Sequence, residues 1–152
     1  MYGLVVVPCG KRKIWDRYPK AGPTKAKDVY IGAPFKVNRE YAEKYGDRWV
    51  ILSAKYGFID PDFVVPRNYN VTFKDASTDP IGVIELKEQI KHKTLDTFDK
   101  LVVLGGRDYA DVVSQAFSDL EVKIKKPVAG HPLGRAMGMV RRAIDEGRPF
   151  DC

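Results

Sequence analysis

The sequence predicts an α/β domain of three layers, in which a mainly parallel central sheet of about four strands is covered by helices. Three observations lead to this prediction. Short continuous aliphatic runs are typical of strands buried on both faces. Segments with a helical period of apolar residues separate these runs. Buried strands that alternate with helices favour a parallel sheet. We expect residues 1–152 to form one such domain.

The first third of the chain supplies two strands, a loop and a helix. Residues 4–7 are four consecutive aliphatic residues, which predict the first strand. Residues 9–31 contain prolines and glycines without a clear period and predict a long loop, a feature that is usually functional or disordered. Pro34 is placed to open a helix that Gly46 closes. Residues 49–52 predict the second buried strand.

The middle of the chain is less regular. Residues 53–77 read as a loop followed by an irregular stretch. Thr78 or Asp79 can then cap a helix whose first position is Pro80. Apolar residues at helical spacing continue this helix to about Phe98.

The last third repeats the alternation. Residues 101–104 predict a third buried strand, and residues 109–117 predict the helix after it. Alternating apolar residues within 121–126 indicate a short exposed strand. Residues 133–146 predict the last helix, which glycine and proline stop.

Positive charge is concentrated in the first predicted loop. The chain has 26 Lys and Arg against 20 Asp and Glu, a net charge of +6. The segment from Cys9 to Lys27 holds seven basic residues and one acidic residue, so it carries +6 alone, while the other 133 residues balance at 19 of each sign. Such an excess suits phosphate-bearing partners, and the alternative is a solvated loop that maintains solubility.

Composition excludes several classes of protein. No apolar run approaches the roughly 20 residues of a membrane span, and the opening residues lack the basic region of a signal peptide. Cys9 and Cys152 are too few and too far apart for a disulfide framework or a zinc site. We expect a cytoplasmic protein with no membrane contact, no metal and no cofactor. The oligomeric state stays open.

Reactive and polar side chains follow the predicted strands at their carboxyl ends, where ligands bind in such sheets. The candidate catalytic residues are His131, Lys55, Asp60, Asp108 and Cys9. The residues expected to bind phosphate or nucleic acid are Lys11, Arg12, Lys13, Ser53, Tyr56, Tyr69, Gly106, Arg107, Tyr109 and Arg135. Glycine-rich loops and helix N-termini can cradle phosphate there. Neither a Walker A motif nor a Rossmann fingerprint is present.

Each candidate has a structural alternative. Cys9 is either a thiolate nucleophile, favoured by Lys11 and Lys13 beside it, or a small buried hydrophobe. His131 lies in a glycine-flanked loop, where it can act as an acid, a base or a donor, or simply cap the next helix. Asp108 at a helix start is also explained by favourable interaction with the helix N-terminus.

Three motifs together resemble a widespread prokaryotic family of small uncharacterised domains. The first strand ends in Cys-Gly-Lys-x-Lys, the second ends in Leu-Ser-Ala-Lys-Tyr-Gly with Asp-Pro after it, and the third is followed by Gly-x-x-Tyr. The resemblance covers most of the chain, at residues 9–13, 28–34, 52–61, 69–72, 105–109 and 132–139. It implies no particular activity.

A second resemblance is to enzymes of known activity. Pro8-Cys9, three residues and Lys13 are similar to the start of the Pro-Cys-x-x-x-Lys-Pro-Tyr motif of archaeosine synthase, a tRNA-modifying enzyme, although Ile14-Trp15 replaces Pro-Tyr and the motif's later Ser and His are absent. Those domains are in turn similar in outline to uracil-DNA glycosylases, whose His-Pro loop has a counterpart in His131-Pro132. The glycosylase water-activating motif is missing here. The resemblance implies a glycosylase-like outline.

We therefore expect a nucleobase- or nucleotide-handling domain that acts on nucleic acid or on a modified-base precursor, by base modification or N-glycosidic chemistry. Two alternatives are a non-catalytic module that binds DNA or RNA, and an enzyme for a small phosphorylated metabolite. In the first hypothesis, His131 or Lys55 donates to the base, and Asp60 or Asp108 faces the sugar or orients water. Three tyrosines would stack on the base: Tyr56, Tyr69 and Tyr109.

Overall fold

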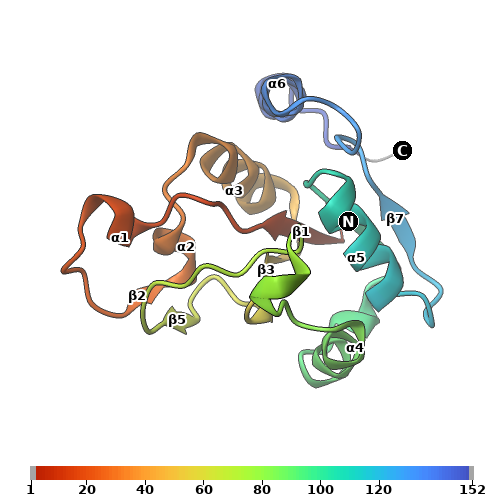
Figure 1. Cartoon of the computed structure of the whole chain (residues 1–152). Coiled ribbons are helices and arrows are strands. Elements are labelled where there is room, and N and C mark those ends of the chain that lie inside the picture. The colour runs from red at the N-terminus through yellow and green to blue at the C-terminus, as the bar shows by residue number, and fades with distance from the viewer. Residues whose placement is uncertain (1–2, 151–152) are drawn as a thin grey trace.

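The computed structural model describes residues 3–150 and is built around a five-stranded sheet with the order β4-β3-β1-β6-β7 (Figure 1). The strands are β1 (Leu4–Pro8), β3 (Arg48–Ser53), β4 (Gly57–Ile59), β6 (Lys100–Val103) and β7 (Lys123–Lys125). β1 pairs in parallel with β3 and β6, and β6 pairs in parallel with β7. Within this sheet only β4 is antiparallel. The mainly parallel α/β fold is confirmed, with one strand more than expected.

Helices cover both faces of the sheet. The four that form the outer layers are α3 (Ala33–Tyr45), α4 (Val83–His92), α5 (Arg107–Ala116) and α6 (Leu133–Asp145). Successive side chains of β1 alternate between two cores, with Val5 among residues of α3 and α6 and Val6 among residues of α4 and α5. Within residues 3–150, no helix has both the length and the apolar character needed to cross a membrane.

Residues 9–31, expected as one long loop, contain short ordered elements. These are α1 (Ile14–Arg17), β2 (Thr24–Lys25) and α2 (Ala26–Val29), and β2 pairs with β5 (Val64–Val65) in a second small sheet. They lie together on one side of the main sheet (Figure 1). The Trp15 ring is buried, and its Nε1–H donates to the Ala21 carbonyl over 2.6 Å. Tertiary contacts therefore order a segment that has no periodic pattern.

The middle of the chain differs most from the prediction. β4 lies where we expected a loop, because Gly57 adopts a φ of +78° and turns the chain back along β3. Thr78 ends the 3₁₀ helix η1 (Ala76–Thr78), and α4 begins only after Gly82. α4 ends at His92, and a second 3₁₀ helix, η2 (Leu95–Thr97), occupies the rest of the predicted helix.

Candidate functional site

Three neighbouring parallel strands place reactive side chains at one edge of the sheet. Ser53 is the last residue of β3. Cys9 directly follows β1 and donates its backbone N–H to the Leu52 carbonyl over 3.0 Å. Tyr109 lies in the first turn of α5, which follows β6. The structure thus brings together predicted residues from three separate parts of the sequence.

A buried set of hydroxyl groups lies behind this edge. The phenol groups of Tyr30 and Tyr69 share a short hydrogen bond. The Ser53 Oγ lies 2.9 Å from the Tyr69 hydroxyl and accepts the backbone N–H groups of Lys55 and Tyr56, each over 3.2 Å. Ser53 is completely buried, so its hydroxyl links the turn after β3 to the tyrosine pair.

Cys9 and Tyr109 form the second half of the cluster. The Cys9 Sγ lies 3.4 Å from the Tyr109 hydroxyl, which also donates to the Cys9 carbonyl over 3.5 Å. The rings of Phe73 and Tyr109 pack edge to face, with their centroids 5.6 Å apart. A Cβ at Gly105 would lie 2.7 Å from the Tyr109 Cβ, so glycine permits this close approach.

Two lysines flank the Tyr69 ring. The Lys13 Nζ lies 4.6 Å from the ring centroid, and only 8% of the Lys13 surface is exposed. Its recorded hydrogen bond is a long one, 3.4 Å, to the Lys11 carbonyl. The Nζ of the exposed Lys55 lies 5.8 Å from the Tyr69 centroid and 5.4 Å from that of Tyr56. Both contacts are within the range of cation–π attraction.

Burial sets the protonation of this cluster. It is the largest cause that raises the pKa of Tyr30, Tyr69 and Tyr109 well above that of a free phenol, and the nearby Cys9 contributes to each shift. Burial also lowers the pKa of the Lys13 amine. The three phenols therefore remain neutral hydrogen-bond donors at physiological pH, while Lys13 loses its proton more readily than an ordinary lysine.

Four further predicted residues lie around the same edge. Lys11 and Arg12 are exposed in the segment after β1. Gly106 is the N-cap of α5, and Arg107 is its exposed first residue. The Arg107 guanidinium packs so closely on Gly130 that a Cβ there would lie 3.1 Å from its Nη2. Exposed cations from the segment after β1 and from the start of α5 thus lie on the same two segments that carry Cys9 and Tyr109.

The structure does not bring every candidate to the cluster. Asp60 follows the antiparallel β4 and pairs with Arg48, at the opposite end of β3, over 3.1 Å. Asp108 is exposed in the first turn of α5 and has no hydrogen bond to the cluster within residues 3–150, but, together with burial, its charge contributes to the raised pKa of the neighbouring Tyr109 phenol. His131 is exposed before α6, and Arg135 lines a separate groove beside that helix. Within residues 3–150, no side-chain hydrogen bond joins either of them to Cys9 or its partners.

Sequence reasoning missed Tyr30 and Phe73 as members of the cluster. Both lie in segments without periodic patterning. For Tyr30 a signal existed, since residues 28–34 are part of the family resemblance. No comparable signal marked Phe73, whose contact with Tyr109 depends on the path of the chain between β5 and α4.

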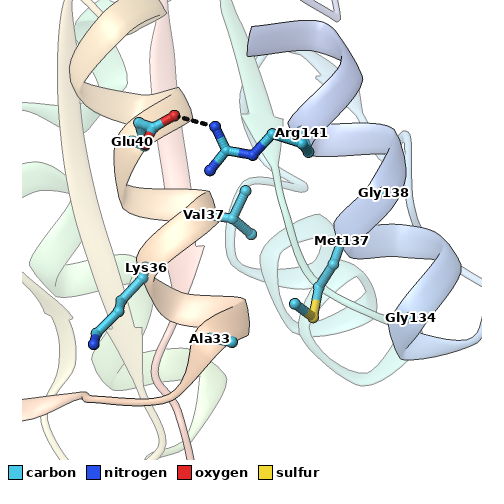
Figure 2. Close-up of a pocket in the computed structure, with 8 residues that line it drawn as sticks. All are labelled: Ala33, Lys36, Val37, Glu40, Gly134, Met137, Gly138 and Arg141. Carbon is cyan, nitrogen blue, oxygen red and sulfur yellow. Dashed lines mark hydrogen bonds and ion pairs between the residues drawn. The ribbon is translucent and has the colours of Figure 1, made fainter. Parts of the chain in front are cut away.

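A groove of about 490 Å³ between α3 and α6 lies apart from these residues (Figure 2). Arg141 reaches across it to Glu40, with an N–O distance of 2.5 Å. Its walls include Val37 and Met137 together with the small residues Gly134 and Gly138, and none of the predicted site residues lines it. Within the described part of the chain, no three His, Cys, Asp or Glu side chains are arranged to hold a metal ion.

Comparison with known proteins identifies relatives without an assigned activity. The model of a family of unknown function, DUF6884, matches residues 4–142. An uncharacterized protein from Bacillus subtilis (strain 168), YfjM, is 37% identical over 147 residues, which are 96% of this chain and 97% of YfjM. The predicted resemblance to a family of small uncharacterised domains is thereby confirmed.

One solved structure is also similar. It is the crystal structure of AF0587, a protein of unknown function, with 16% sequence identity and a TM-score of 0.45. The alignment covers 98% of this chain and 46% of that one, so this chain spans about half the length of AF0587.

Proposed function

Since this chain belongs to DUF6884, a family of unknown function, we propose its activity from the site: it handles nucleobases, in nucleic acid or in a nucleotide precursor, by base modification or by N-glycosidic chemistry. The observation that carries the proposal is the donor-rich cluster at the sheet edge. The Lys13 amine and the phenols of Tyr30, Tyr69 and Tyr109 supply donors, and within residues 3–150 none of the hydrogen bonds of these side chains goes to a carboxylate. Such a cluster complements the negative charge that develops on a departing base.

The rim of the cluster fits the rest of a nucleotide. Four cations are exposed and therefore hydrated in the free protein, and each can neutralise a phosphate on binding: Lys11, Arg12, Lys55 and Arg107. Tyr69 is buried, whereas Tyr56 and Tyr109 are half-buried and keep ring surface that could stack on a base; Tyr56 packs edge-on against Tyr69.

The chemistry also needs groups that face the sugar. Cleavage of an N-glycosidic bond leaves positive charge on the sugar, which a carboxylate stabilises. Asp108 adjoins Tyr109 and is our candidate for this role, whereas Asp60 is held by Arg48. The resemblance of residues 8–13 to archaeosine synthase supports base modification, and that of His131-Pro132 to uracil-DNA glycosylases supports N-glycosidic chemistry, although the exposed His131 lies outside the cluster.

Nucleic-acid binding tests the proposal first. Fluorescence anisotropy would measure the affinity for labelled single-stranded DNA, duplex DNA and tRNA at two salt concentrations. We expect the double variant Lys11→Ala/Arg12→Ala to bind more weakly and to lower the magnitude of the slope of log K against log salt by about 1.4 for single strands and about 1.8 for duplex DNA, because two phosphate contacts are lost. The matched control is Lys91→Ala/Lys123→Ala, which removes two exposed lysines away from the carboxyl edge. It should leave the slope nearly unchanged.

The other outcomes separate the alternatives. If the two double variants changed the salt slope equally, Lys11 and Arg12 would not be phosphate-binding residues. Salt-sensitive binding without release or exchange of any base, in a chromatographic screen of modified nucleosides, would favour a non-catalytic binding module. Binding of free nucleotides with indifference to polymers would favour an enzyme for a small phosphorylated metabolite.

A further inference from the structure

Lys13 is buried without the partner that a buried ammonium normally has. Within residues 3–150, no carboxylate oxygen lies within 4.0 Å of its Nζ. The neighbouring Asp16 uses its carboxylate to accept the Lys13 backbone N–H over 2.8 Å. What remains to the amine is the long hydrogen bond to the Lys11 carbonyl and the face of Tyr69. Burial of an ammonium with so few partners destabilises the folded chain. A functional role would explain why a lysine stands at this position.

The backbone holds Lys13 in this position. It forms an isolated antiparallel bridge with Tyr30, and the adjoining Arg12 carbonyl accepts the Ile31 N–H over 3.1 Å. The Lys13 carbonyl also accepts the N–H of Asp16 over 2.9 Å at the start of α1. These backbone hydrogen bonds order the segment around Lys13 and so fix the position of its Cα. The side chain extends from there to the tyrosine cluster, with Nζ over the Tyr69 ring.

We propose that Lys13 is a nucleophilic lysine that forms an imine with the opened sugar of a nucleotide whose base has departed. This inference rests on the proposed N-glycosidic function. Its carriers are the buried amine without a carboxylate partner, the neighbouring Cys9 and tyrosine donors, and the exposed cations that would hold the flanking phosphates. Desolvated lysines are the usual choice for imine formation, because the neutral amine is the nucleophile. The lowered pKa of Lys13 agrees with this role.

The reaction balances with Lys13 in two successive roles. Its ammonium gives a proton to the departing base as the C1′–N bond breaks and the electron pair moves to the base nitrogen. The lone pair freed on the amine then bonds to the electron-poor C1′. The C1′–O4′ bond breaks next, a proton passes from the nitrogen to O4′, and a protonated imine remains. Water finally adds to C1′, which releases the sugar aldehyde and returns the ammonium.

Borohydride trapping tests this directly, with an oligonucleotide that carries one abasic site as the probe. Hydride reduction of the imine would leave a stable covalent complex, and peptide mass spectrometry would locate the attachment. We expect it at Lys13 in the wild-type chain, in preference to the exposed lysines. Lys13→Arg keeps a cation but cannot form the imine, so the yield should fall by about tenfold or more. The matched control Lys91→Arg makes the same substitution at an exposed lysine of α4, outside the rim and the cluster, and should keep the wild-type yield.

Attachment spread over exposed lysines, or an absence of the complex, would overturn the inference. Mapping in the wild-type chain keeps the test valid even if Lys13→Arg fails to fold, which circular dichroism would reveal. Anisotropy with the intact oligonucleotide separates the two proposals. Binding without trapping at Lys13 overturns the imine alone, and absence of both binding and trapping overturns the proposed function as well.

Discussion

Ser53 shows how a single small residue can hold the site together. Its hydroxyl is completely buried, contacts the Tyr69 phenol and accepts two backbone N–H groups from the turn that follows β3. No other described residue bonds at once to this turn and to the tyrosine pair. The geometry of the cluster therefore depends on one oxygen atom.

Replacement of Ser53 by alanine should lower the free energy of unfolding by about 1–3 kcal/mol, because two amides and one phenol lose a buried partner. Urea unfolding monitored by circular dichroism would measure it. Ser118→Ala is the matched control, since that exposed hydroxyl donates only to the nearby Gln115 carbonyl. Equal effects of the two substitutions would show that the Ser53 bonds contribute little.

The buried phenols predict a loss of stability in alkali. Burial raises the pKa of Tyr30, Tyr69 and Tyr109, so the folded chain keeps protons that the unfolded chain releases above about pH 10. Their contribution is fully present below that pH and declines as the pH rises above it. Tyrosinate absorbance should show these three ionising together with unfolding. Their ionisation in a still folded chain would contradict the prediction.

At the scale of elements, side-chain contacts determine the short helices and strands that the apolar pattern of the sequence does not predict. β4 has only three residues, too few to show a pattern, and the Gln89 side chain of α4 completes its pairing. Gln89 accepts the Phe58 N–H over 2.8 Å and donates to the Tyr56 carbonyl over 2.9 Å. Likewise α1 and α2 have four residues each and depend on contacts such as that of Trp15 with Ala21. The longer strands and helices, whose pattern is intrinsic, were predictable to within a few residues, except α4, which begins three residues later and ends about six residues earlier than expected.

The contact between Gly57 and Gln89 predicts a non-additive pair of substitutions. A Cβ at Gly57 would lie 2.2 Å from the Gln89 Oε1, at a φ of +78°. Gly57→Ala should therefore cost about 2–4 kcal/mol of unfolding free energy, from left-handed strain and lost hydrogen bonds. Gln89→Ala alone should cost about 1–3 kcal/mol.

The double variant should be more stable than the sum predicts by about 1 kcal/mol, because the bonds of Gln89 can be lost only once. Chemical denaturation of all four chains would measure this coupling. Gly138→Ala serves as the control, since a Cβ there meets nothing within 4 Å inside α6. Strict additivity would contradict the contact between Gly57 and Gln89.

For the whole molecule, parallel topology explains which site residues the sequence could reveal. Cys9, Ser53 and Tyr109 lie at or just after the carboxyl ends of parallel strands, where ligands bind in such sheets, so the sequence located all three. The structure does not place Asp60 at these carboxyl ends, because the antiparallel β4 carries the chain back to the opposite end of the sheet. Tyr30 enters the cluster through a bridge to Lys13 that depends on the folded path of residues 9–31.

The central place of β1 has a consequence for synthesis. Its partners β3 and β6 begin at Arg48 and Lys100, so β1 leaves the ribosome well before either of them. One side of β1 can pair with β3 once that strand is made, but the other side stays unpaired until β6, which begins at Lys100 of the 152 residues. Such distant pairing slows folding. A nascent chain with such an uncovered aliphatic strand is prone to associate with others. We therefore expect nascent chains to associate through the open side of β1 until β6 covers it, a consequence of the same central position that aligns the site.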